Sequence, residues 1–234
     1  MHPATDPTLA GRLLARSTAA LVSPYDVTGL MSRLLDDCVE ALGADSAGLL
    51  VTTEPALEML SATSHRAVEL EMMQSQTDAG PCVEAIRSRE RVSSCSQEDM
   101  AARWPAFSAV AERAGYRSLH ARPMTWQGRV IGGLNLFYSE AGELTSQQED
   151  CAQAFADVAT LAILNAGGRN PTEITQALKS ALRGRTVIEQ AKGVLAHQRG
   201  VDMERAYAML KEHAARERRS ISEVAGATIE GARR

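Results

Sequence analysis

The chain of 234 residues has few aromatic residues and no long apolar run. Only 4% of its residues are Phe, Trp or Tyr, whereas 44% are hydrophobic, so its core has to be built mainly from aliphatic side chains. No run of eighteen apolar residues occurs, and the N-terminal sequence lacks a basic region followed by an apolar block. We therefore expect a soluble cytoplasmic protein that does not contact a membrane.

Cysteines are few and widely separated. They are Cys38, Cys82, Cys95 and Cys151. There is no C-x-x-C pair and no histidine at zinc-ligand spacing, so we expect no metal site. We interpret the four residues as reduced, partly buried small hydrophobic side chains, with a redox-sensing thiol as the alternative.

The sequence also lacks the short motifs of common enzyme classes. It has no P-loop, no G-x-S-x-G, no H-E-x-x-H and no paired-glycine dinucleotide fingerprint, and its five histidines are scattered. Acidic neighbours such as Asp36 and Asp37 point in different directions on an expected helix, so we interpret them as solvated. These absences predict a protein that is not an enzyme and that uses no cofactor.

Charge is unevenly distributed along the chain. Residues 172–234 contain twelve Lys or Arg against eight Asp or Glu, a net charge of +4, whereas residues 1–171 have a net charge of −8. All three lysines, Lys179, Lys192 and Lys211, lie in the basic part. A cationic helical face supplies the salt-dependent share of nucleic-acid affinity, although many charged runs are only solvated faces.

Residues 26–166 alternate helical and strand patterns, after a short helical candidate at 9–22. Helices are expected at 26–42, 66–74, 81–89, 99–114 and 145–165, and strands at 46–53, 57–63, 91–95, 116–124 and 130–138, with turns at 54–55 and 127–128. On the last strand Leu134 and Leu136 occupy one face, whereas Ile131 and Phe137 occupy the other. Both faces are therefore covered, which predicts a mostly antiparallel sheet with helices on both sides.

Four motifs in this region resemble those of a GAF domain of the kind that is joined to ANTAR modules. They are GPCVEA at 80–85, RWPAF at 103–107, S-x-x-x-RPM at 118–124 and GxxxGGLNLFY at 128–138. The resemblance covers residues 25–166 and implies a sensor domain. One interpretation is a pocket for a small-molecule effector near Cys82 and Trp104, between the sheet and the segments 72–82 and 101–116. The other is a dimerisation scaffold with a filled core. The N-K-x-F-D-E signature of cyclic-nucleotide binding is missing.

The C-terminal part has the pattern of three consecutive helices. In the first, Ile188, Ala191 and Leu195 share a face, and the helix ends at Arg199-Gly200. Asp202 caps the second helix, and the S-x-x-E pattern of Ser220 and Glu223 starts the third. Glycines at 167–168 and Asn170-Pro171 separate this unit from the sensor, so we divide the chain into an extension at 1–24, a sensor at 25–166, a linker at 167–171 and a helical domain at 172–234.

The sequence VIEQAKG at 187–193, followed by Ala206-Tyr207, resembles the ANTAR domain, the RNA-binding output module of bacterial transcription antiterminators. The resemblance implies that this module binds paired stem-loops in nascent messages and so prevents a competing terminator hairpin. The residues that we expect to bind RNA are Arg183, Arg185, Lys192, Gly193, Arg205, Tyr207 and Lys211. Tyr207 is the only aromatic residue of the module, and it is either an RNA contact or a core residue.

Together these patterns predict an α+β protein, with a GAF-like α/β sandwich followed by an all-α three-helix ANTAR-like module. We expect it to be a signal-responsive antiterminator, with RNA stem-loops as partner and a homodimer as its active form. A heptad-like stripe from Ile174 to Leu195 serves either a dimer or packing within one chain. The alternatives are a DNA-binding regulator and a non-enzymatic ligand-binding or dimerisation protein.

Overall fold

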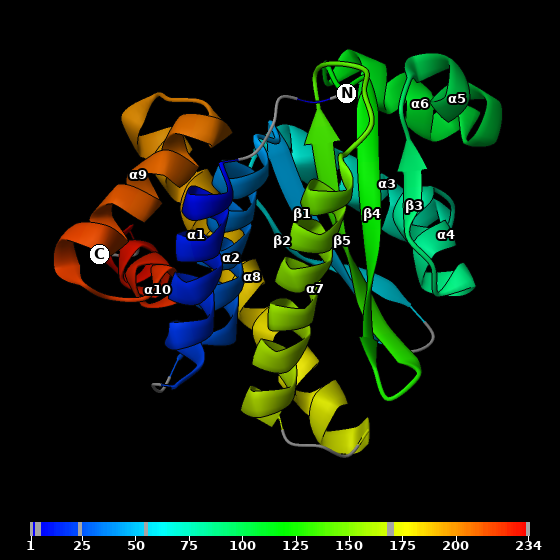
Figure 1. The fold of residues 1–234 in the computed structure, drawn as a ribbon. Coiled ribbons are helices and arrows are strands. Elements are labelled where there is room, and N and C mark those ends of the chain that lie inside the picture. The colour runs from blue at the N-terminus through cyan, green and yellow to red at the C-terminus, as the bar shows by residue number, and fades with distance from the viewer. Residues whose placement is uncertain (1, 3–5, 23–24, 54–55, 168–170, 233–234) are drawn as a thin grey trace.

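A five-stranded antiparallel sheet forms the centre of the N-terminal domain (Figure 1). The computed structural model describes residues 2, 6–22, 25–53, 56–167 and 171–232. The strands are β1 (Ser46–Thr52), β2 (Leu57–Ala62), β3 (Val92–Ser94), β4 (Ser118–Trp126) and β5 (Arg129–Tyr138), in the order β2-β1-β5-β4-β3. Gln127 and Gly128 join β4 to β5 with φ of 48° and 78°, as a tight hairpin turn requires. The turn expected at 54–55 lies outside the described residues.

Helices cover both faces of the sheet, as the sequence predicts. One face carries α1 (Pro7–Ala19), α2 (Val27–Leu42) and α7 (Ser146–Gly167). The other carries α3 (His65–Thr77), α4 (Pro81–Ser88) and α6 (Pro105–Arg113), with α5 (Gln97–Arg103) beside β3. A short 3₁₀ turn, η1 (Ala20–Val22), follows α1. The resulting α+β sandwich has a separate apolar core on each side of its sheet.

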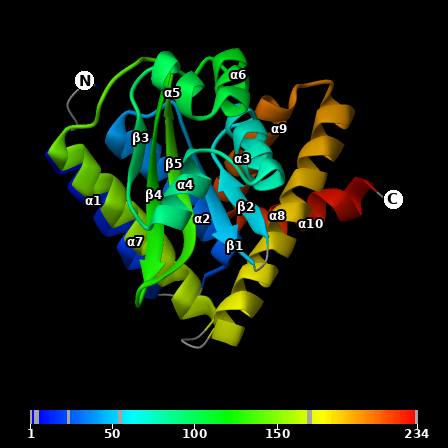
Figure 2. The same cartoon turned by 90° about the vertical axis from the view of Figure 1, so that its right-hand side faces the viewer.

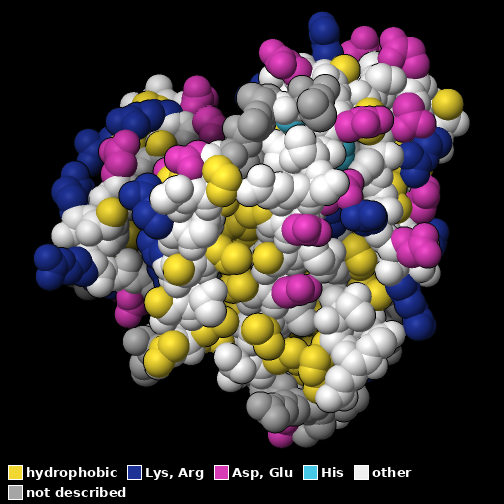
Figure 3. Space-filling model, in the orientation of Figure 1, with side chains coloured by type: hydrophobic (Ala, Val, Ile, Leu, Met, Phe, Trp, Pro, Cys, Tyr) yellow, Lys and Arg dark blue, Asp and Glu magenta, His cyan; other side chains and the backbone are white. Residues whose placement is uncertain are grey.

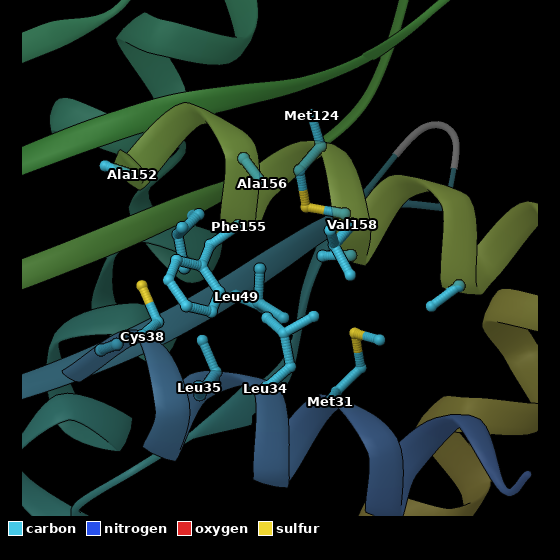
Figure 4. Packing of buried hydrophobic residues seen from close by; sticks show 14 of the residues in the cluster. Met31, Leu34, Leu35, Cys38, Leu49, Met124, Ala152, Phe155, Ala156 and Val158 are labelled. Carbon is cyan, nitrogen blue, oxygen red and sulfur yellow. The ribbon is translucent and has the colours of Figure 1, made fainter. Parts of the chain in front are cut away.

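The larger of these cores lies between α2 and α7. Leu34, Leu35 and Cys38 of α2 face Phe155 of α7 across Leu49 of β1, and all five are at most 1% exposed (Figure 4). Their spacing on α2 is the i, i+1, i+4 pattern of a buried helical face. The Thr145–Gln148 capping box that starts α7 is formed, because Thr145 accepts from the Gln148 amide and donates to its side chain.

The structure corrects two details of the sequence prediction. Trp104 separates α5 from α6, where one helix over 99–114 was expected, because Pro105 disfavours a helical conformation at the residue before it. Ile131 packs in the same cluster as Leu134 and Leu136, not with Phe137. The strand register shifts between Met124 and Thr125, directly opposite this end of β5, so strict alternation fails there.

Three helices follow the sensor: α8 (Pro171–Arg199), α9 (Met203–Glu217) and α10 (Ile221–Ala232). With 29 residues, α8 is about 43 Å long and runs beside β2 (Figure 2). Its first half buries Ile174, Leu178 and Ala181 against the sensor core, and its second half contributes Ile188 and Ala191 to a core shared with α9 and α10. The heptad-like stripe therefore packs within one chain.

The expected caps of the last two helices are present. Asp202 accepts from the Arg205 amide at 2.7 Å, and Ser220 and Glu223 form their reciprocal capping box. None of the described helices combines the length and apolar character that crossing a membrane requires.

Candidate nucleic-acid interface

Tyr207 lies between two lysines of the helical module. The ring centroid is 5.1 Å from Lys192 Nζ on α8 and 4.8 Å from Lys211 Nζ on α9. Lys192 is 2% exposed, and its ammonium group bonds both carboxylate oxygens of Glu189 at 3.0 Å. We call Lys192, Tyr207 and Lys211 the cation–aromatic cluster. Three of the residues predicted to bind RNA therefore lie in one place.

The sensor contacts two members of this cluster. The Tyr207 hydroxyl is 2.8 Å from Ser32 Oγ, and Lys211 Nζ is 3.1 Å from Asp36 Oδ1, so both bonds go to α2. Burial raises the pKa of Tyr207, so the phenol stays protonated. Burial also raises the pKa of Asp36, an effect that Lys211 opposes. The expectation that Asp36 and Asp37 are merely solvated was wrong, since Asp37 is 4% exposed and pairs with Arg16.

The rest of α8 is also held by the sensor. Arg185 Nη1 donates to the Met59 carbonyl at 2.9 Å, and burial lowers the pKa of its guanidinium. The Thr28 hydroxyl donates to the Ala181 carbonyl at 2.8 Å. At Gly184 the helices approach so closely that a Cβ would collide with the Thr28 side chain. Glycine at 184 therefore permits the contact between α8 and α2.

The other predicted RNA contacts lie apart from the cluster. Arg183, Gly193 and Arg205 are exposed, and Arg205 pairs with Glu212 at 2.9 Å. A Cβ built on Gly193 would meet nothing within 4 Å in the described chain, so a small residue is not needed there for packing within this arrangement. The position is open to an external partner.

The two residues predicted to lie near an effector pocket have different environments. Cys82 is fully buried, and its Sγ fills the space where Gly133 lacks a side chain. Trp104 is 9% exposed, carries the Arg103 guanidinium 4.1 Å from its ring centroid, and lines a hollow of about 460 Å³ together with Gly80 and Val83. A surface hollow therefore lies beside Trp104, whereas Cys82 is in the core and does not line it.

A buried carboxyl group lies near Cys82 and was not recognised from the sequence. Glu71 on α3 is fully buried and accepts from Asn135 Nδ2 at 2.6 Å and from Gln74 Nε2 at 3.2 Å. Burial raises its pKa from 4.5 to about 8. Gly48 on β1 makes room for this side chain, since a Cβ there would collide with it.

A larger cleft, of about 880 Å³, opens between α2 and the α9–α10 corner. Its sensor wall includes Gly29, Ser32 and Arg33, and its opposite wall includes Lys211 and Arg218. Lys and Arg side chains gather over the α9 and α10 part of the surface in Figure 3. Across the described part of the chain, no group of three or more His, Cys, Asp or Glu side chains is placed to hold a metal ion.

The fold defines a two-domain protein, in which an α+β sandwich of GAF type contacts a three-helix module at the cation–aromatic cluster. Comparison with known families agrees: residues 25–164 match the GAF domain family and residues 176–229 match the ANTAR domain family. The chain belongs to the GAF domain family and carries an ANTAR domain after the sensor. A comparison with curated protein sequences gave no match.

Solved structures show the same sensor fold at low sequence identity. The GAF domain of a phosphoenolpyruvate-protein phosphotransferase from Coxiella burnetii is 16% identical, with a TM-score of 0.54 over 68% of this chain and 95% of that one. Reduced fRMsr of Staphylococcus aureus is 11% identical, with a TM-score of 0.53 over 69% and 99%. The corresponding GAF domain from Acinetobacter is 12% identical, with a TM-score of 0.52 over 69% of this chain and 96% of that one. These similarities establish the fold of the sensor.

Proposed function

We propose that this protein is a signal-responsive RNA-binding antiterminator whose sensor covers its RNA-binding surface until a signal arrives. The observation that supports this most directly is the cation–aromatic cluster, which lies inside the ANTAR domain and is bonded to the sensor through Ser32 and Asp36. In this proposal the protein is regulatory and catalyses no reaction.

The chemistry of the cluster suits a single-stranded RNA loop. Unstacked bases bind on aromatic rings, and lysine ammonium groups bind phosphates. Tyr207 provides a ring and Lys192 and Lys211 provide the charges, while the exposed Arg183 and Arg205 extend the basic surface. Tyr207 is 7% exposed and belongs to the apolar core of the module together with Ile188 and Leu210, so a base reaches its ring only after the module moves away from α2 and the side chains around the ring rearrange.

The two polar contacts that the cluster itself makes with the sensor are individually weak. The Ser32–Tyr207 hydrogen bond contributes about 1 kcal/mol, and the partly exposed Lys211–Asp36 pair about 0.5 kcal/mol. Opening also breaks the contacts of α8 and α10 with the sensor, so the ligand that opens the protein has to prefer the open state by more than these two contacts contribute. The helix α7, which contacts both α2 and α8, is the element that transmits the change.

We also propose that the active form is a homodimer in the cytoplasm, with the domain division at 167–171. Apolar side chains remain outside on the helical layer of the sensor: Leu161 on α7 is 48% exposed and Val22 after α1 is 88% exposed. Such residues suit an interface with a second copy. Sedimentation analysis of Leu161→Glu tests this, because a dimer through this layer dissociates whereas a monomer sediments unchanged.

RNA binding is tested by a competition experiment on the full chain. A labelled tandem stem-loop RNA pool is titrated in a salt series against unlabelled hairpin RNA and duplex DNA. We expect hairpin-selective binding that Lys192→Ala weakens about tenfold and that Lys179→Ala, an exposed lysine on the same helix, leaves nearly unchanged. Equal competition by duplex DNA would support the DNA-binding alternative, and an absence of salt-dependent binding would support a ligand-binding or dimerisation protein.

A further inference from the structure

We infer that the cleft between α2 and the α9–α10 corner is an effector site for a small anionic molecule with an apolar body. The cleft lies outside the Cys82–Trp104 region, and both domains form it. Its volume of about 880 Å³ falls within the range of small-molecule sites.

The charges that line the cleft favour an anion. Its carboxylates already have partners: Asp36 binds Lys211, Asp26 accepts from the Gly29 amide and the Ser222 hydroxyl, and Glu223 accepts from Ser220. Two of the arginines in the cleft, in contrast, have no such partner among the residues that the structure describes.

Arg33 on the sensor wall and Arg218 on the module wall are exposed, and neither has a side-chain partner within the described residues. The charged side chains that line the cleft are Arg33, Lys211, Arg218 and Arg219 against Asp26, Asp36 and Glu223, so the cleft as a whole carries one excess positive charge. A phosphate, sulfonate or carboxylate that reaches both guanidinium groups satisfies them together.

The floor of the cleft favours an apolar body next to the charged group. Ala20, Ala214 and Ala215 are small, so they leave space, and Tyr25 and Ile221 add apolar surface. The Tyr25 hydroxyl donates to the Ala162 carbonyl at 2.7 Å, which fixes its ring against the sensor. A flat hydrophobic group fits over such a floor, as ligand sites combine apolar walls with a few placed polar groups.

An anion held by arginines from both walls ties the module to the sensor. Because the anion contacts both walls only while they lie together, its binding favours the closed arrangement. The ligand is then a co-repressor that keeps the cation–aromatic cluster covered. This consequence depends on the proposed RNA-binding function, whereas the existence of the site does not.

The test uses 8-anilinonaphthalene-1-sulfonate, a fluorescent probe that has one anionic group on an apolar body. We expect the full chain to bind it at one site. The Arg33→Gln/Arg218→Gln double variant should bind it at least about fivefold more weakly. Ala215→Trp, which fills the cleft from an exposed position, should abolish binding, and Arg113→Gln, an exposed arginine on α6, should change nothing.

Amide hydrogen exchange on the same samples measures how far the probe favours the closed arrangement. Amides of α9 around Tyr207 and Lys211 should exchange more slowly when the probe is bound, and the Ala215→Trp variant should show no such change. An absence of probe binding, or equal binding by all variants, would overturn the site. Faster exchange in α9 on binding would overturn the co-repressor assignment. No RNA is present, so failure here is distinct from failure of the proposed RNA-binding function.

Discussion

Replacing Glu71 by Gln should make the stability of the protein much less dependent on pH. In the native protein burial raises the pKa of Glu71 to about 8, whereas the unfolded chain has the ordinary value of 4.5. Between these two values the native state keeps a proton that the unfolded state has lost. Stability therefore falls as pH rises through this window, by about 1.4 kcal/mol per pH unit.

From pH 5 to pH 7.5 this amounts to about 3 kcal/mol, or roughly 9 °C in Tm for a chain of this size. Glutamine resembles the protonated side chain because it is uncharged and its oxygen accepts from Asn135 Nδ2 as Glu71 does, although its amide group replaces the oxygen that accepts from Gln74 Nε2. The variant should match the wild type at pH 5 and exceed its free energy of unfolding by up to about 3 kcal/mol at pH 7.5.

Urea unfolding of both proteins at half-unit pH steps from 5 to 8 measures this difference. Glu69→Gln on the same helix is the matched control, because Glu69 is 58% exposed and should leave the wild-type slope unchanged. A Glu71→Gln protein that keeps the wild-type pH slope, or that is less stable than wild type at pH 7.5, would refute the account of this carboxyl group.

Two further predictions concern the contact between the module and the sensor. Tyr207→Phe removes only the hydroxyl that bonds Ser32, so it should favour the open form and tighten RNA binding about threefold. Fluorescence anisotropy measures this affinity, and weaker binding would show that the hydroxyl itself contacts RNA. Gly184→Val should collide with the Thr28 side chain and separate α8 from α2, so amides of α8 near Ala181 should exchange at least about tenfold faster. The control is Gly193→Val, which has nothing of the described chain within 4 Å of its Cβ and should alter exchange only through the helix propensity of Val. Equal protection of these amides in both variants would count against the packing of α8 on α2.

The sequence predicted the features that depend on local chemistry. The caps at Asp202, at Ser220 and at Thr145 lie within three residues of their partners, so their short patterns identify them. The sheet and its two helical layers followed from strand alternation and helical spacing. The break at Trp104 and the register shift opposite Ile131 were missed, because a proline effect and a strand irregularity interrupt an otherwise regular pattern.

Of the residues that form the candidate site, the sequence predicted only those that belong to the helical module. Lys192, Tyr207 and Lys211 were selected as RNA contacts, and the structure places them together, but their role in binding RNA is still a prediction. Their partners Ser32 and Asp36 are 175 residues away along the chain, and no local pattern reveals such a pairing. Glu71 was missed for a similar reason, because only the folded sheet shows that it is buried.

The most direct test of the central claim is the affinity of an opened protein for RNA. Ser32→Ala/Asp36→Asn removes the hydroxyl that bonds Tyr207 and the negative charge that pairs with Lys211, without changing the module, and Glu40→Gln, an exposed carboxylate on the same helix, is the control. If the sensor covers the RNA-binding surface, the double variant should bind tandem stem-loop RNA about tenfold more tightly than wild type, and the control should not differ. Unchanged or weaker binding by the double variant would contradict the claim.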